Sequence, residues 1–345
     1  MQVPELTVTD LVDLARGRRL STFVGAAHGV PAAIVEVGDD PSRDPVGGID
    51  PDGELELLPA VLIGVGRERS PAPAFVDVVV EDAASGRQLA ERVGQAPLAS
   101  TSLALLLRGG AWRGVAGGLV SESTAYSMLQ GSGEFRAWRA TRPVRPRPST
   151  TAADEAVGSG MRPPVRVEHL GSLTQLVLDR PGRHNAFDAA TAELVVATLT
   201  DALAADHPGP VVLRGEGPSF CSGGDLDEFG TFPDPAAAHA IRLARSAGHL
   251  VHLLRDRMEV RLHGACIGAG IEVPAFAGRV VAAPDTRIAL PEVSLGLIPG
   301  AGGTVSLPRR IGRHRTMELA LHDGAIDAAT ALAWGLVDAI VEQRS

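Results

Sequence analysis

The stretch HGACIGAGIEVPAFAG, residues 263–278, decides the fold of the second half of the chain. An apolar strand pattern that begins at Met258 runs into it and ends in small residues, which let the backbone approach a ligand closely. Glu272 then opens the predicted helix, and Pro274 falls in its first turn, where an N–H group has no partner to lose. Free N–H groups at a strand end, beside the positive end of a helix, can bind a negatively charged oxygen. The stretch therefore predicts an oxyanion hole next to a carboxylate.

A second stretch, SFCSGGDLDEF at residues 219–229, ends another strand in small residues. Two such strand ends can direct their backbone N–H groups at one oxygen. Glu292 lies twenty positions after Glu272, within LPEVSLGLIPGAGGT. Two carboxylates at one pocket can divide acid and base work when their surroundings separate their pKa values. Taken alone, Glu272 could also be a favourable charge at a helix N-terminus, and Glu292 a carboxylate of a surface loop.

Strand-like and helix-like segments alternate around these two stretches. The pattern predicts a β-hairpin at 165–179, helices at 188–205 and 239–256, and strands at 210–217, 258–270 and 279–292. Such alternation is typical of an α/β fold with a largely parallel sheet.

The first part of the chain is a separate, smaller α/β domain in this interpretation. Its runs 31–37, 57–66 and 75–82 are rich in Val and Ile and predict strands, while 98–142 has helical spacing and Thr9 or Asp10 caps a short helix. A Pro-, Ser- and Ala-rich linker at 143–164 separates domain 1–142 from domain 165–345. Domain 1–142 shows no cluster of catalytic residue types.

Composition excludes several classes of function. The net charge of −9 argues against nucleic-acid binding through bulk charge, and all 32 basic residues are Arg, which excludes Schiff-base lysine chemistry. No apolar run reaches membrane-spanning length, so no membrane partner is expected. Two cysteines make no disulfide framework, and we expect a cytoplasmic protein.

The cysteines and histidines are predicted to be structural. Cys221 and Cys266 are expected to be small buried fillers rather than nucleophiles, because nothing beside them in the sequence would lower a thiol pKa. His263 is expected to be a core histidine. No metal is expected, since His169, His184 and His263 lack the spacing of metal ligands.

Five motifs carry a resemblance to a known family: VRLHGACIGAGIE (260–272), PEVSLGLIPGAGGT, FCSGGDL, RPGRHNAFD and ALAWGLVDAIV. In order and spacing they resemble the enoyl-CoA hydratase/isomerase (crotonase) family over about residues 165–340. The resemblance implies a spiral core of repeated ββα units and an acyl-CoA substrate. It also implies no cofactor apart from the CoA of that substrate, and a homotrimer or hexamer.

Carried over position by position, the resemblance also assigns a site. It implies that the N–H groups of Gly224 and Ala269 hold the thioester oxygen. Glu272 would hold and deprotonate water, and Glu292 would deliver a proton to the α-carbon. The implied contacts to CoA and substrate are Arg183, Ala186, Asp225, Leu226 and Asp227.

The helices that close the family's fold should follow GLVDAIV, residues 335–341, yet residues 97–142 resemble them instead. We therefore expect domain 1–142 to be a degenerate crotonase repeat. Its helices should dock on the catalytic half of the same chain or of a neighbour.

The leading functional expectation is a lyase that adds or removes water across the α,β-double bond of an acyl-CoA thioester. Three alternatives stay open: an enoyl-CoA double-bond isomerase, a cofactor-free enzyme like the aryl-acetyl-CoA dioxygenases, and a non-catalytic scaffold that binds acyl-CoA.

Overall fold

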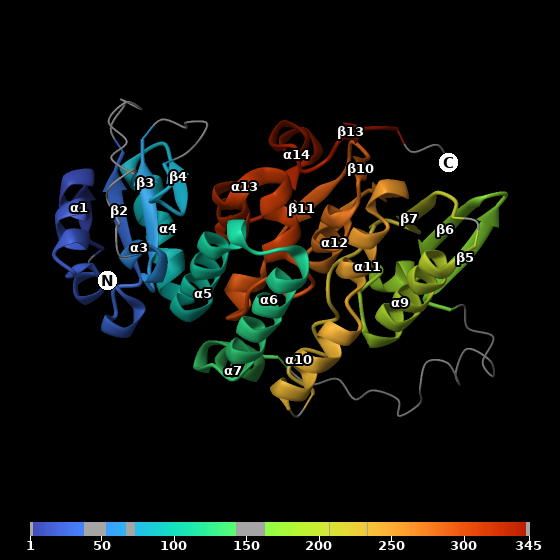
Figure 1. Ribbon diagram of the computed structural model, residues 1–345, viewed down its shortest axis with the longest axis horizontal. Helices are drawn as coiled ribbons and strands as arrows, with labels where there is room; N and C mark the ends of the chain where they lie inside the picture. Colours follow the sequence, from blue (N-terminus) through green and yellow to red (C-terminus); the bar gives the residue numbers. More distant parts are fainter. Residues whose placement is uncertain are drawn as a thin grey trace.

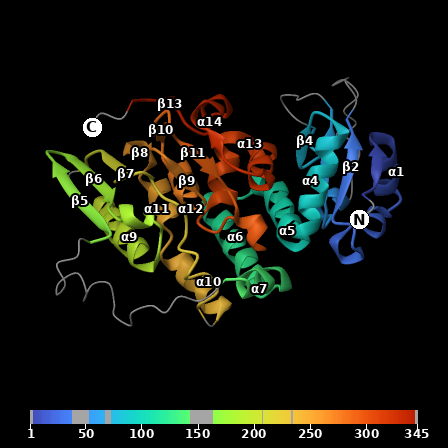
Figure 2. The ribbon, with the colours of Figure 1, turned by 180° about the vertical axis from the view of Figure 1, so that it is seen from behind.

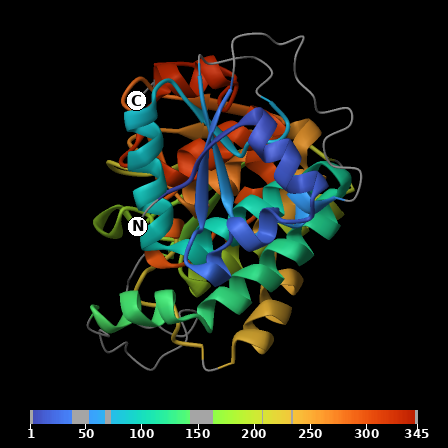
Figure 3. The ribbon, with the colours of Figure 1, turned by 90° about the vertical axis from the view of Figure 1, so that its left-hand side faces the viewer.

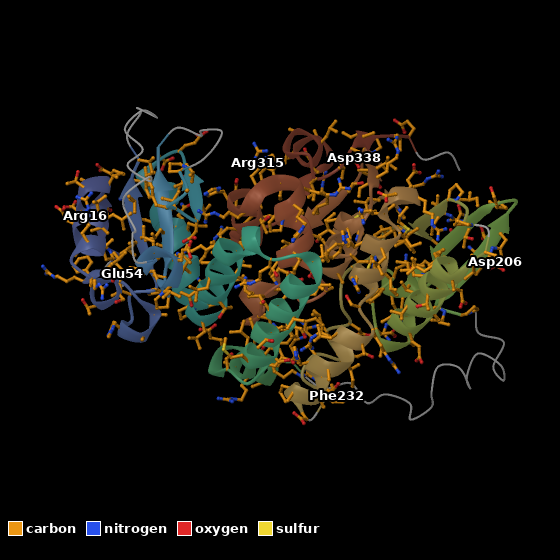
Figure 4. The ribbon with its side chains drawn as sticks, viewed as in Figure 1. Arg16, Glu54, Asp206, Phe232, Arg315 and Asp338 are labelled. Atoms are coloured by element: carbon orange, nitrogen blue, oxygen red, sulfur yellow. The ribbon has the colours of Figure 1, made fainter. Side chains whose placement is uncertain are left out.

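A computed structural model describes residues 3–37, 53–66, 73–142, 163–206, 208–232 and 234–342. The predicted linker at 143–164 lies outside the described residues except for its last two positions. Figure 1 shows an elongated molecule, with a small sheet at one end and a β-hairpin at the other. Arg16 and Asp206 lie near these opposite ends (Figure 4).

The N-terminal sheet contains four parallel strands in sequence order. They are β1 (Glu5–Thr7), β2 (Ala32–Glu36), β3 (Val61–Val65) and β4 (Val78–Val80). Side chains of a strand alternate between the two faces of a sheet. Ile63 accordingly belongs to a core with Ala90 and Leu103, whereas Leu62 belongs to a second core with Leu11. In Figure 3 this sheet lies in front of the rest of the molecule.

The predicted strands at 31–37, 57–66 and 75–82 are confirmed, but the predicted helix cap is wrong. Helix α1 (Val8–Arg16) is capped by Thr7, not by Thr9 or Asp10. The Thr7 hydroxyl accepts from the Asp10 N–H at 3.1 Å, and the Asp10 carboxylate accepts from the Thr7 N–H at 2.8 Å. Asp10 is therefore the third helical residue of a reciprocal capping box.

Helices connect this sheet to the second half of the molecule. They are α4 (Ala83–Gln95), α5 (Pro97–Arg108), α6 (Val115–Gln130) and α7 (Gly133–Ala140), which confirms the helical pattern at 98–142. Figures 1 and 2 show α5 between the N-terminal sheet and α13 (Gly303–Leu321), and α6 below α13. α6 packs against α13 and against α10 (Pro235–Ala244). The helices thus dock on the C-terminal half of their own chain.

The C-terminal half contains two sheets. The larger has the order β13-β10-β8-β7-β6-β5, and all its neighbours are parallel except the β5–β6 hairpin. Its strands are β5 (Val165–Leu170), β6 (Leu173–Leu178), β7 (Val211–Gly215), β8 (Met258–Leu262), β10 (Arg279–Ala282) and β13 (Ala339–Ile340). The smaller sheet contains β9 (Ala265–Ile267), β11 (Arg287–Ala289) and β12 (Ile326–Asp327).

The remaining helices are α9 (Ala189–Ala204), α11 (Ala247–Leu253), α12 (Ala269–Glu272) and α14 (Ala328–Trp334). The single helix predicted at 239–256 is two helices, α10 and α11. The chain leaves helical geometry at Arg245, and the Ser246 hydroxyl caps the new helix by accepting from the His249 N–H. The predicted α/β fold, with a smaller N-terminal α/β domain that ends in helices, is confirmed.

Candidate active site

A cavity of about 300 Å³ lies where α6, α10 and α11 meet the turns of the C-terminal half. Four of the residues predicted for the site line it: Gly224, Ala269, Glu272 and Glu292. The N-terminal domain contributes Leu119, Glu122, Ser123 and Tyr126 to the same lining. The cavity is therefore built from both halves of the chain.

The two small-residue turns predicted from the sequence lie against each other. Gly223 has a φ of 90°, and a Cβ there would lie 2.7 Å from the Ile267 carbonyl oxygen, so only glycine permits this approach. Gly224 follows in the first turn, and Ala269 begins α12 in the second. Among the described residues, neither N–H group donates to a protein acceptor. Two free N–H groups therefore line one cavity, as an oxyanion hole requires.

Glu272 ends α12 instead of opening a helix, so that prediction is wrong. The helix begins at Ala269, directly after Gly268, and consists of one turn. The Glu272 side chain is 2% exposed, and its Oε2 accepts from the N–H groups of Ala301 and Gly303 at 2.8 and 2.9 Å. Burial raises the pKa of Glu272 to about 7, although these two hydrogen bonds act in the opposite direction.

Glu292 is buried as well, which excludes a surface loop carboxylate. It begins a short 3₁₀ turn, η8 (Glu292–Leu295), and its Oε2 has no hydrogen-bond partner among the described residues. A Cβ on Gly268 would lie 2.2 Å from Glu292 Oε1 and 3.8 Å from Glu272 Oε1, so the two carboxyls converge on this glycine. Burial, and then the charge of Glu272, raise the pKa of Glu292 well above its ordinary value.

A third carboxyl group, Glu122 on α6, was not predicted. It is 2% exposed and accepts from the Gly302 N–H at 2.7 Å, the Thr304 N–H at 2.8 Å and the Thr304 hydroxyl at 2.7 Å. Burial, and then the charge of Glu272, raise its pKa to about 8. Domain 1–142 therefore contributes an ionisable side chain to the cavity. The sequence did contain a sign of this residue. Glu122 lies three residues after Leu119 and four before Tyr126, so it falls on the apolar face of the predicted helix, where an acid is unusual.

Two arginines, Arg242 and Arg245, line the cavity, and among the described residues neither forms an ion pair with these three acids. Arg242 of α10 lies over the Tyr126 ring, 4.6 Å from its centroid, and its Nε donates to the Ser123 hydroxyl at 3.1 Å. Burial raises the pKa of the Tyr126 hydroxyl and lowers that of Arg242. The cavity therefore combines proton-holding carboxyls with free backbone donors, which suits proton transfer beside a stabilised anion.

Comparison with known proteins identifies a family for the second half of the chain. A family model for enoyl-CoA hydratase/isomerase matches residues 168–345. The chain belongs to the enoyl-CoA hydratase/isomerase family. The match begins at residue 168, so the origin of domain 1–142 as a degenerate repeat of this family stays a prediction.

Solved structures of enoyl-CoA hydratases are similar to the same half of the chain. The enzyme from Thermoplasma volcanium is 31% identical over 53% of this chain and 73% of that chain, with a TM-score of 0.47. The enzyme from Bacillus anthracis is 30% identical over 52% and 70%, with a TM-score of 0.48. The enzyme from Mycobacterium smegmatis is 26% identical over 52% and 71%, with a TM-score of 0.48.

The residues assigned to CoA by family resemblance lie outside the cavity lining. They are Arg183, Ala186, Asp225, Leu226 and Asp227. Arg183 is exposed, and its Nη2 lies 3.1 Å from Asp225 Oδ2 and 3.7 Å from Asp227 Oδ2. The Asp227 N–H also donates to Asp225 Oδ1 at 3.0 Å, which folds this loop into a compact turn. A role of the loop in holding CoA stays a prediction.

The residues predicted to be structural lie in the core. Cys221 and Cys266 are buried, and burial raises the pKa of the Cys221 thiol to about 12, which leaves it a poor nucleophile. The buried His263 ring has Nε2 3.0 Å from the Gly217 carbonyl oxygen and does not line the cavity.

The described residues contain neither a cluster suited to a metal ion nor a helix suited to span a membrane. Across these ranges, no three or more His, Cys, Asp or Glu side chains are placed to hold a metal ion together. No helix in the described part of the chain combines the length and apolar character needed to cross a membrane.

Proposed function

We propose that this protein is a lyase that adds water to, or removes water from, the α,β-double bond of an acyl-CoA thioester. One observation carries the proposal: a single cavity is lined by the free N–H groups of Gly224 and Ala269 and by the carboxyls of Glu272 and Glu292. A thioester oxygen bound by the two N–H groups would place its α- and β-carbons beside the carboxyls.

The two acids differ in a way that supports separate roles. Glu272 has one oxygen held by two backbone N–H groups, so its other oxygen is available to hold a water molecule. Glu292 has an unpartnered oxygen, and burial, followed by the charge of Glu272, raises its pKa well above the ordinary value, which favours the protonated form. In this assignment Glu272 removes a proton from a water molecule while the oxygen of that water attacks the β-carbon. Glu292 gives a proton to the α-carbon.

The negative charge that forms in this reaction lies on the thioester oxygen as an enolate. Donors fixed in place before the reaction stabilise such a charge without reorganising, and one donor typically contributes about 2.7–4 kcal/mol. The N-terminus of α12, where Ala269 stands, adds its partial positive charge at the same point.

The test uses a short 2-enoyl-CoA and follows the loss of absorbance of the conjugated thioester. We expect hydration by the wild type, and a kcat about 10²–10⁴-fold lower in Glu272→Gln and in Glu292→Gln. Glu193→Gln on the exposed surface of α9 is the control and should match the wild type.

Other outcomes would overturn the proposal in favour of an alternative. Migration of the double bond with no oxygen from labelled water in the product, and loss of activity only in Glu292→Gln, would indicate an isomerase. Consumption of O₂ with an aryl-acetyl-CoA would indicate a dioxygenase-like enzyme. Tight binding of acyl-CoA without turnover would indicate a scaffold.

A further inference from the structure

We propose that Glu122, which α6 of the N-terminal domain places at the cavity, is a positioning residue for Glu272. It would fix the turn to which the Glu272 carboxylate is anchored, so that the N-terminal domain completes the active site of its own chain. This inference rests on the proposed function, because that function gives Glu272 its catalytic role.

The geometry behind the proposal is an alternation of hydrogen bonds along one turn. Four successive backbone N–H groups, of residues 301–304, donate in turn to Glu272, Glu122, Glu272 and Glu122. Gly302 donates to one Glu122 oxygen, while the N–H and hydroxyl of Thr304 donate to the other. The turn therefore lies between two carboxylates, and the removal of either one frees half of its donors.

These donors belong to the start of α13, whose first N–H groups have no partner within the helix. A buried N–H group without an acceptor is costly, so the turn would move to find water or another acceptor if Glu122 were lost. Any such movement shifts Ala301 and Gly303, which hold Glu272 Oε2.

The donors explain why a carboxylate stands at this position. Gly302 donates to Glu122 Oε1 and Thr304 donates to Oε2, whereas a neutral amide has only one accepting oxygen and would leave one of these N–H groups without a partner. The titratable groups that line the cavity with Glu122 are Tyr126, Asp188, Glu228, Arg242, Arg245, Glu272 and Glu292. Among the described residues no cation forms an ion pair with Glu122.

The position of α6 is itself tightly fixed. A Cβ on Gly300 would lie 2.4 Å from the Tyr126 ring, and a Cβ on Gly302 would lie 3.4 Å from Leu119 Cδ2. The helix packs against the backbone of the turn at both points, one helical turn before and after Glu122. The carboxylate is thus held in place by its own helix as well as by its donors.

The experiment compares Glu122→Gln and Glu122→Asp with Glu134→Gln in the full-length chain. Glu134 is a matched control, because its carboxylate also accepts from two N–H groups at a helix start, those of Leu98 at 2.7 Å and Ala99 at 3.1 Å. Glu134 does not line the cavity.

We expect Glu122→Gln to lower kcat about 10–100-fold with a KM changed less than about threefold, because a small misplacement of a catalytic group has effects of this size. We also expect the ascending limb of its kcat–pH profile to move to higher pH, since the two N–H groups that lower the pKa of Glu272 would be displaced. Glu122→Asp should restore part of kcat, and Glu134→Gln should keep the wild-type kcat and profile.

A second measurement makes the result independent of turnover. A carboxyl titration by ¹³C NMR of Glu-labelled protein should show a higher pKa for Glu272 in Glu122→Gln than in the wild type. An unchanged Glu272 pKa would overturn the inference. A lower one would also overturn it, because loss of charge rather than loss of position would then dominate. A wild type without hydratase activity would overturn the proposed function instead, and the titration would still decide whether Glu122 positions Glu272.

Discussion

Two regions of the molecule bury acidic side chains and surround them in opposite ways. Asp77, just before β4, is 2% exposed and pairs with Arg108 on α5 and with Arg313 on α13. Arg108 also donates to three backbone carbonyls, those of Leu55, Leu58 and Ala60. At the cavity, by contrast, the carboxyls of Glu122, Glu272 and Glu292 come together, and among the described residues none of these three forms an ion pair with a cation.

The difference separates a structural charge from a functional one. A buried charge that is paired and fully hydrogen-bonded has its desolvation cost offset, and losing its partner is costly. Like charges that share a buried cavity raise one another's proton affinity and weaken the fold above neutral pH. Such an arrangement is typical of sites where chemistry, rather than stability, accounts for the residues present.

The largest expected effect comes from breaking the paired cluster. Asp77→Ala leaves the Arg108 side chain, only 8% exposed, without its counter-charge. We expect it to lower the free energy of unfolding by about 3–5 kcal/mol, as loss of one partner of a buried pair does. Denaturant unfolding measures this, and kcat of the folded fraction should stay within about threefold of the wild type.

Asp323→Ala is the matched control for that change. Asp323 also pairs with an arginine of the N-terminal domain, Arg92, at 3.2 Å, but its side chain is 87% exposed. An exposed pair contributes about 0–1 kcal/mol, so this variant should unfold almost like the wild type. Equal losses in the two variants would contradict the assignment of Asp77 to a structural cluster.

Replacing a cavity acid should raise the free energy of unfolding, whereas replacing Asp77 lowers it. The pKa of Glu292 is raised above its unfolded value, so between about pH 4.5 and its folded pKa only the unfolded chain releases this proton. Stability is therefore full below about pH 4.5 and falls as pH rises, by about 1.4 kcal/mol per pH unit for one proton. Glu292→Gln removes this dependence, and we expect a variant that is inactive yet increasingly more stable than the wild type as the pH rises from about 5 toward the folded pKa of Glu292.

Thermal or denaturant unfolding across this pH range measures the difference between the two proteins. The wild type and Glu292→Gln losing stability in parallel would show that Glu292 is not held protonated by the fold.

Much of this architecture follows from local patterns in the sequence. Short Val- and Ile-rich runs bounded by Gly, Pro and Asp mark most of the strands, and the two small-residue turns mark the place where Gly224 and Ala269 come together. The features that were missed lack such a local signal. Strand β1 has three residues, and the buried face of α4 consists of Gly86, Ala90 and Val93, which gives a weak apolar period.

Long-range partners explain the other differences. Glu122 could be recognised from the sequence as an acid at a core position, but its donors Gly302 and Thr304 follow 180 and 182 positions later. The pairing of Asp77 with Arg313 likewise spans 236 positions. The contribution of Glu122 to the cavity and the ion network between the halves are therefore not visible until the chain is folded.

The smallest expected effect concerns the contact between α6 and α13, which joins the two halves. Two neighbouring glycines of α6, Gly117 and Gly118, allow it to be tested. A Cβ on Gly117 would meet nothing within 4 Å, whereas a Cβ on Gly118 would lie 2.9 Å from Val305 Cγ2 of α13. Ala is favoured over Gly inside a helix by about 0.5–1 kcal/mol, so Gly117→Ala should stabilise the protein by about that amount.

At position 118 the same helical gain is opposed by overpacking against Val305, which is 2% exposed and has no room to move. Overpacking a buried contact typically costs about 1–3 kcal/mol, so Gly118→Ala should be neutral or destabilising by up to about 2 kcal/mol. Because Glu122 lies one turn further along α6, displacement of the helix should also lower kcat severalfold in this variant and not in Gly117→Ala. Equal stabilisation by both substitutions, with unchanged kcat, would show that α6 does not need its close approach to α13 to complete the cavity.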